Sequence, residues 1–216
     1  VKPSIALINN IACAHLAGFG SIEGVAKAKG EIFQSLASSG IAIVNLDDAR
    51  VTEQAKNHLA KNFTYSINNK NADVKALKLI KQNNGCFQWT LEHQNQRVQI
   101  NLQVPGKHNV ANAVAASACA LAMNISLDNI KQGLESFHGV AGRLIVKNMP
   151  NDCTLIDDTY NANLSSVKAA IDVLAQYSGN KIFILGELAE AGASLTEQYQ
   201  EIGLYAKEQQ IDVLYS

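Results

Sequence analysis

The sequence is poor in arginine and has no surplus of positive charge. Its 216 residues include 18 lysines and arginines and 19 aspartates and glutamates, which gives a formal net charge of −1. The arginines, Arg50, Arg97 and Arg143, are too few and too scattered to form the basic stripe with which proteins neutralise nucleic-acid phosphates. We therefore exclude general nucleic-acid binding.

Dense cysteine pairs and long apolar runs are also missing. The four cysteines, Cys13, Cys86, Cys119 and Cys153, form neither a CxxC motif nor a disulfide framework, so we expect free thiols in a reducing cytosol. No apolar run approaches the roughly 20 residues that span a bilayer, and the N-terminus lacks the layout of a signal peptide. With 47% hydrophobic residues, the chain can bury a core without disulfide or metal support.

Strand and helix patterns alternate in the first part of the chain. The β-branched runs SIALI and GIAIVN predict buried strands on either side of a helix over residues 21–36, which indicates a crossover unit. Further predicted elements are a strand over 75–80, a hairpin of CFQWTL and RVQINLQV, a helix over 108–123, and a helix that follows its N-cap Ser126.

After the segment HGVAGR, the alternation becomes strict. The predicted elements are strand CTLID, a helix over 164–177, strand KIFIL, a helix over 195–207 and strand IDVLY. This βαβαβ order is typical of a parallel, doubly wound sheet. A boundary near residues 141–150 therefore divides an α/β protein into two units, 1–141 and 142–216.

Lys29 is out of place on the predicted helix over residues 21–36, because helical spacing puts it on the same apolar face as Val25 and Phe33. A lysine on a buried face must snorkel, pair with a carboxylate, or lose its charge through a shifted pKa or a modification. Snorkelling is the simplest alternative. A functional role becomes the better interpretation if an anion or metal lies nearby, and His15, beyond the first strand, is a candidate ligand.

Two polar loops of the second unit follow strands, at the sheet edge where ligands bind in open α/β folds. They are DDTYNAN, residues 157–163, and GELAEAGAS, residues 186–194, which contains Glu187 and Glu190. The alternative is that Asn163 only caps the next helix and that the acids are merely solvated. Neither loop has a GxGxxG turn, which disfavours a nicotinamide site. The GK in PGKHN does not indicate a phosphate-binding loop, because the earlier glycine and the following Ser or Thr of GxxxxGK(S/T) are missing.

Four separated motifs together resemble those of the Mur ligase family. In order, they are NNIACAHLAGFGSIEGVAKAKGEIF, PGKHNVANAVAA, GVAGR and DDTYNAN. The resemblance implies a ligase that uses ATP to phosphorylate a carboxylate, after which an amine attacks the acyl phosphate. The residues of these motifs are most similar to those of the branch that joins D-alanyl-D-alanine to a UDP-linked muramoyl tripeptide in peptidoglycan precursor synthesis. A sister ligase that adds a different amino acid, or a non-catalytic nucleotide-binding module, is an alternative.

The resemblance also implies roles for individual residues. It assigns His15, and Lys29 if carbamylated, to a magnesium ion, and it places both with Arg143 in catalysis. The residues that it implies for ATP are Asn10, His108, Asn109, Asn112, Arg143 and Asp158. The residues that it implies for the active cleft and the incoming dipeptide are Tyr160, Asn161, Asn163, Glu187 and Leu188.

Two parts of the family pattern are absent from the 216 residues: the phosphate-binding GxxxxGK(S/T) loop and the N-terminal domain that grips the UDP moiety. The chain is therefore expected to be an internal piece. It would hold most of a central ATP-binding domain, residues 1–141, and the first half of a Rossmann-like C-terminal domain, residues 142–216. We expect this piece alone to be inactive, and its parent to be cytoplasmic and monomeric.

Overall fold

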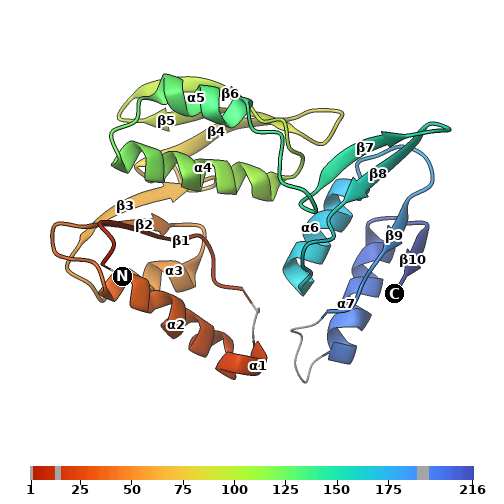
Figure 1. The fold of residues 1–216 in the computed structure, drawn as a ribbon, viewed down its shortest axis with the longest axis horizontal. Coiled ribbons are helices and arrows are strands. Elements are labelled where there is room, and N and C mark those ends of the chain that lie inside the picture. Colours follow the sequence, from red (N-terminus) through yellow and green to blue (C-terminus); the bar gives the residue numbers. More distant parts are fainter. Residues whose placement is uncertain (1, 13–15, 189–194) are drawn as a thin grey trace.

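The computed structural model describes residues 2–12, 16–188 and 195–216 (Figure 1). Three residues singled out in the sequence, Cys13, His15 and Glu190, lie outside the described residues. None of the helices in the described part is long and apolar enough to cross a membrane. The predicted α/β class is confirmed, because helices and strands alternate along the chain.

A six-stranded sheet with the strand order β1-β2-β3-β4-β5-β6 forms the first unit (Figure 1). Strands β1 to β4 run parallel, and β4, β5 and β6 pair in antiparallel fashion. Their bounds are β1 Ile5–Ile8, β2 Ile41–Asn45, β3 Lys61–Ser66, β4 Val74–Lys81, β5 Phe87–His93 and β6 Gln96–Asn101. The sequence predicted all of these strands except β3, whose first residues, Lys61 and Asn62, are exposed and polar.

Helices pack on both faces of this sheet. Along β2 the side chains alternate, so that Ala42 and Val44 belong to the same apolar cluster as Phe33, whereas Ile43 belongs to the cluster of Val110. The helices are α1 Leu16–Phe19, α2 Ile22–Gln34, α3 Ala49–Gln54, α4 Lys107–Ala122 and α5 Leu127–Glu135. The predicted helices over 21–36 and 108–123 are confirmed, as is the N-cap Ser126, while the short α3 was not predicted.

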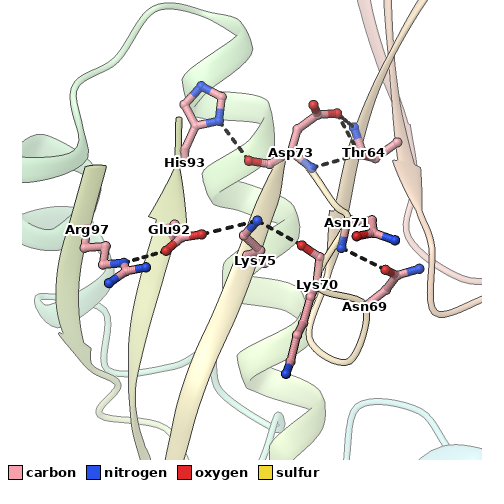
Figure 2. Close-up of polar contacts among 9 residues, drawn as sticks. All are labelled: Thr64, Asn69, Lys70, Asn71, Asp73, Lys75, Glu92, His93 and Arg97. Carbon is pink, nitrogen blue, oxygen red and sulfur yellow. Dashed lines mark hydrogen bonds and ion pairs between the residues drawn. The ribbon is translucent and has the colours of Figure 1, made fainter. Parts of the chain in front are cut away.

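An ionic row crosses the antiparallel strands (Figure 2). Lys75, Glu92 and Arg97 are directly opposite one another on β4, β5 and β6. Glu92 is buried, and its carboxylate lies 3.2 Å from the Lys75 ammonium and 2.5 Å from Arg97 Nε. Because opposite charges on adjacent strands attract, this row favours the observed register of the three strands.

The second unit contains two pairs of strands. β9 (Ile182–Ile184) and β10 (Val213–Tyr215) pair in parallel, and α7 (Leu195–Glu208) lies between them in the chain, as predicted. β8 (Cys153–Asp157) differs from the expected parallel sheet, because it pairs in antiparallel fashion with β7 (Ile145–Met149), which was not predicted. Asn151 and Asp152 in the connecting turn have φ angles of 60° and 55°, the left-handed values that a tight hairpin of this kind requires. α6 (Leu164–Leu174) follows β8.

Candidate functional site

The carboxyl ends of β1 and β2 bring polar residues from two loops together. Asn45 Nδ2 donates a hydrogen bond to the carbonyl oxygen of Asn9 over 2.8 Å. Asp48 Oδ2 accepts one from the backbone N–H of Ile11 over 2.7 Å, while the same side chain caps α3. These bonds fix the start of the loop after β1, which contains the candidate residue Asn10.

α2 carries Lys29 to this loop. Ser21 caps the start of this helix, and Phe33 on its apolar face is fully buried. Lys29 is half-buried, and its Nζ donates to the carbonyl oxygen of Asn10 over 2.9 Å. The side chain therefore snorkels from the apolar face with its ammonium on the candidate loop. The structure thus brings Lys29 and Asn10 together. The role of His15, which lies outside the described residues, and a metal role of Lys29 if it is carbamylated stay predictions.

A row of side-chain amides connects the first turn of α4 to the end of β1. Asn109 Nδ2 donates to the carbonyl oxygen of Pro105 over 2.7 Å, and Asn112 Nδ2 donates to Asn109 Oδ1 over 3.3 Å. Asn9 Nδ2 donates to Asn112 Oδ1 over 2.8 Å, and the Tyr65 hydroxyl donates to Asn9 Oδ1 over 2.7 Å. The structure therefore groups the predicted residues Asn109 and Asn112 with Asn9 and Tyr65, which the sequence did not predict. The NN pair after the first strand was the available signal for Asn9.

His108 faces a different space from this row. Gly106, at the N-cap of α4, has a φ of 98°, and a Cβ there would lie only 2.5 Å from His108 Cε1. The imidazole lines a cavity of about 680 Å³ between the first turn of α4 and α6, where Asp172 and Gln176 also lie. Burial lowers the pKa of His108, and the nearby carboxylate of Asp172 opposes that shift only in part.

Arg143 is held over the ring of Tyr160, with its guanidinium carbon 3.9 Å from the ring centroid. Two hydrogen bonds fasten the surrounding backbone: Tyr160 N–H donates to the Gly142 carbonyl over 3.1 Å, and Leu144 N–H donates to Asp158 Oδ1 over 3.2 Å. Burial raises the pKa of Asp158, against the opposing effects of the Leu144 N–H and the Arg143 guanidinium. Three predicted residues of the second unit are thus brought together: Arg143, Asp158 and Tyr160.

The other predicted residues of the second unit are used differently. Asn163 caps α6 through a reciprocal capping box with Ser166, which is the structural alternative considered above. Asn161 and Glu187 are exposed and accessible to a ligand. Leu188 is only 3% exposed and packs in an apolar cluster, and its backbone N–H donates to the Tyr199 hydroxyl over 3.3 Å. Its contact with the dipeptide stays a prediction.

The described residues offer no ready-made metal cage. Within residues 2–12, 16–188 and 195–216, no three histidine, cysteine, aspartate or glutamate side chains gather in an arrangement that could hold a metal ion. At the sheet edge, the carboxylate of Asp47 accepts hydrogen bonds from the hydroxyl of Ser66 and the backbone N–H of Ile67. His15 lies outside the described residues, so its binding of magnesium stays a prediction.

Two family models match consecutive parts of the chain. The Mur ligase middle domain matches residues 1–120, and the Mur ligase glutamate ligase domain matches residues 142–216. Among curated proteins, UDP-N-acetylmuramoyl-tripeptide--D-alanyl-D-alanine ligase of Escherichia coli (strain K12) is 40% identical over 216 residues, which is 100% of this chain and 48% of the relative. The chain thus spans about half the length of the curated relatives that it matches.

Solved structures of MurF ligases also align with nearly the whole of this chain. A crystal structure of MurF from Acinetobacter baumannii aligns with a TM-score of 0.89 at 35% identity, covering 99% of this chain and 46% of that chain. MurF ligase from Thermotoga maritima in complex with ADP aligns with a TM-score of 0.83 at 21% identity, covering 100% of this chain and 53% of that chain. At the lower identity, the likeness shows the fold alone.

Proposed function

Because this chain belongs to the Mur ligase family, we propose that it forms part of an ADP-forming ligase that joins D-alanyl-D-alanine to UDP-N-acetylmuramoyl-tripeptide. The match to the E. coli ligase over all 216 residues carries this proposal, because that relative's name states these substrates. ATP would phosphorylate the terminal carboxylate of the tripeptide. The dipeptide amine would then form the new amide bond and expel phosphate. We place the reaction in the cytoplasm and expect a monomeric enzyme.

The reaction accumulates negative charge on the acyl phosphate and on the tetrahedral intermediate, so cations placed in advance stabilise it. An unmodified Lys29 would supply such a cation, because its ammonium donates a hydrogen bond to the Asn10 carbonyl at the sheet edge, whereas a carbamylated Lys29 would be an anion and would act through the metal. Arg143 supplies a planar guanidinium whose paired N–H groups match phosphate oxygens. Its position over Tyr160, beside Asp158, supports a place at the nucleotide.

ATP and magnesium belong to the same proposal. The amides of Asn109 and Asn112 fit a nucleotide base, because an amide offers a donor and an acceptor side by side. The carboxylate of Asp158 fits the ribose hydroxyls, which donate. Magnesium, held by His15 and by Lys29 if it is carbamylated, would neutralise phosphate charge.

A chimera tests the proposed reaction. This chain replaces the matching segment of the E. coli ligase, and phosphate release is measured with ATP, the UDP-linked tripeptide and D-alanyl-D-alanine. We expect turnover with the dipeptide and none with single amino acids, and the E. coli enzyme itself is the control. Turnover with a single amino acid alone would instead support a sister ligase. A folded chimera that binds ADP but releases no phosphate would support a non-catalytic nucleotide-binding module.

A further inference from the structure

The peptide group between Asn10 and Ile11 is held at both of its polar ends. Its carbonyl oxygen, which belongs to Asn10, accepts a hydrogen bond from Nζ of Lys29 over 2.9 Å. Its N–H, which belongs to Ile11, donates to Oδ2 of Asp48 over 2.7 Å. Because the C=O and N–H of a trans peptide point in opposite directions, Lys29 and Asp48 hold one rigid group from opposite edges. A single peptide therefore links the two side chains.

The Asp48 end of this link is fixed in place by α3. One carboxylate oxygen of Asp48 accepts from the Ile11 N–H, and the other accepts from two backbone N–H groups at the start of α3. α3 packs closely on α2, because a Cβ on Gly30 would lie only 2.3 Å from Oε1 of Gln54. The contact between these two helices therefore sets the position of Asp48 relative to the helix that carries Lys29.

The peptide depends on Asp48 for its orientation. The preceding peptide is already fixed, because Asn45 Nδ2 donates to the Asn9 carbonyl oxygen over 2.8 Å. Ile11 is only 3% exposed, so without Asp48 its N–H would be a buried donor that lacks a partner, which is costly. Rotation of the peptide toward another acceptor would relieve that cost. The same rotation would turn the Asn10 carbonyl away from Lys29.

We propose that Asp48 is a positioning residue of the ligase, which acts through the Asn10–Ile11 peptide to hold Nζ of Lys29 at the sheet edge. The inference rests on the proposed function, in which Lys29 serves the acyl phosphate either as a cation or, if carbamylated, through the metal. Both forms of the side chain keep an N–H on Nζ that can donate to the Asn10 carbonyl. Asp48 therefore places this nitrogen in either form, while its own two oxygens are used within the protein.

The substitution Asp48→Asn in the chimera isolates this role. Asparagine caps a helix as well as aspartate does, so its one side-chain oxygen can stay with α3. Its Nδ2 then faces the Ile11 N–H, and two donors repel each other. Asp48→Ser, whose hydroxyl also caps a helix but supplies no second acceptor oxygen, is used if the first variant does not fold. Asp128→Asn, an equal charge change in the exposed first turn of α5, is the control.

Two readouts on the chimera test the inference. In the ligase assay, we expect Asp48→Asn to lower kcat at least about tenfold with little change in the KM for ATP, because a slightly misplaced group loses its action in the transition state. The second readout is reductive methylation in bicarbonate-free buffer, where Lys29 keeps a free amine, followed by mass spectrometry. Relative to the exposed Lys61 in the same sample, we expect Lys29 to react at least about threefold faster once its hydrogen bond is lost.

The two readouts separate this inference from the proposed function. With an active chimera, an unchanged kcat or an unchanged reactivity of Lys29 in Asp48→Asn would overturn the inference. Equal changes in Asp128→Asn would also overturn it, because they would show a general effect of charge. If the folded wild-type chimera were inactive with every amine substrate, the proposed function would be wrong. The reactivity of Lys29 would then decide alone whether Asp48 holds it.

Discussion

At the scale of single residues, Arg143 illustrates how a long flexible cation is held in place before a ligand arrives. Its side chain is exposed, yet the stack on Tyr160 and the two backbone bonds around Gly142 and Leu144 limit where the guanidinium can go. A side chain that is already ordered loses less conformational entropy when it binds a phosphate. Tyr160 therefore influences binding through Arg143, even without touching the anion.

Replacing Tyr160 by leucine should weaken nucleotide binding. A cation–π contact at an exposed site contributes about 0.5–1 kcal/mol, so we expect the dissociation constant of ADP for the chimera to rise about 2- to 5-fold, while Tyr160→Phe keeps the wild-type value. Calorimetry measures both. Tyr215→Leu, at another exposed tyrosine of the second unit, is the control. An equal loss in the phenylalanine variant would show that the hydroxyl and not the ring acts.

At the scale of elements, the ionic row of Lys75, Glu92 and Arg97 ties three strands together where the sheet becomes antiparallel (Figure 2). Figure 2 also shows Asp73 beside Thr64, whose hydroxyl and backbone N–H both donate to that carboxylate. Polar side chains thus fasten β3 to the residue before β4, although these two strands pair at only two positions.

Protonating Glu92 should loosen this sheet. The hydrogen bonds from Arg97 and Lys75 hold the pKa of Glu92 below its usual range. A carboxylate with a lowered folded-state pKa stabilises the fold above its unfolded pKa of about 4.3, and this contribution is lost as the pH falls through the folded value. Glu92→Gln should therefore lower the midpoint of thermal unfolding at pH 7, and the difference from wild type should shrink toward pH 3. Glu31→Gln, the same substitution at an exposed position on α2, is the matched control.

At the scale of the whole molecule, the two units meet at the loop that contains Asn84 and Gly85. The Tyr177 hydroxyl at the end of α6 donates to the carbonyl oxygen of Asn84 over 3.3 Å. Next to it, a Cβ on Gly85 would lie 3.2 Å from Gln176 Oε1. The loop between β4 and β5 therefore contacts the second unit closely, at one end of the cavity that His108 lines.

Two alanine substitutions separate backbone strain from crowding at this contact. Gly85 and Gly179 both have positive φ angles, 76° and 85°, but a Cβ on Gly179 would have nothing within 4 Å. Each change should cost about 1–2 kcal/mol through the left-handed backbone. Gly85→Ala should lower the thermal unfolding midpoint further, because it also crowds Gln176 of the second unit and Pro105 of the first. Equal midpoints for the two variants would contradict close packing around Gly85.

Local sequence patterns predicted the elements well, but contacts between distant segments less well. The N-caps Ser126 and Asn163 precede apolar residues at helical spacing, so each helix start could be recognised from a few neighbours. The packing of Leu188 in an apolar cluster could not be recognised locally, because its neighbours in space come from elsewhere in the chain. The α3 helix was missed because its six residues are too few to show a period.

The sequence by itself determined the alternation of helices and strands, the family motifs and the odd position of Lys29, since each depends on residues close together in the chain. Only the tertiary structure decided that Asn9 meets Asn112, because the two residues are separated by 103 positions and come together only when α4 packs against the sheet. A contact of this kind is fixed by the fold and has no local signal in the sequence.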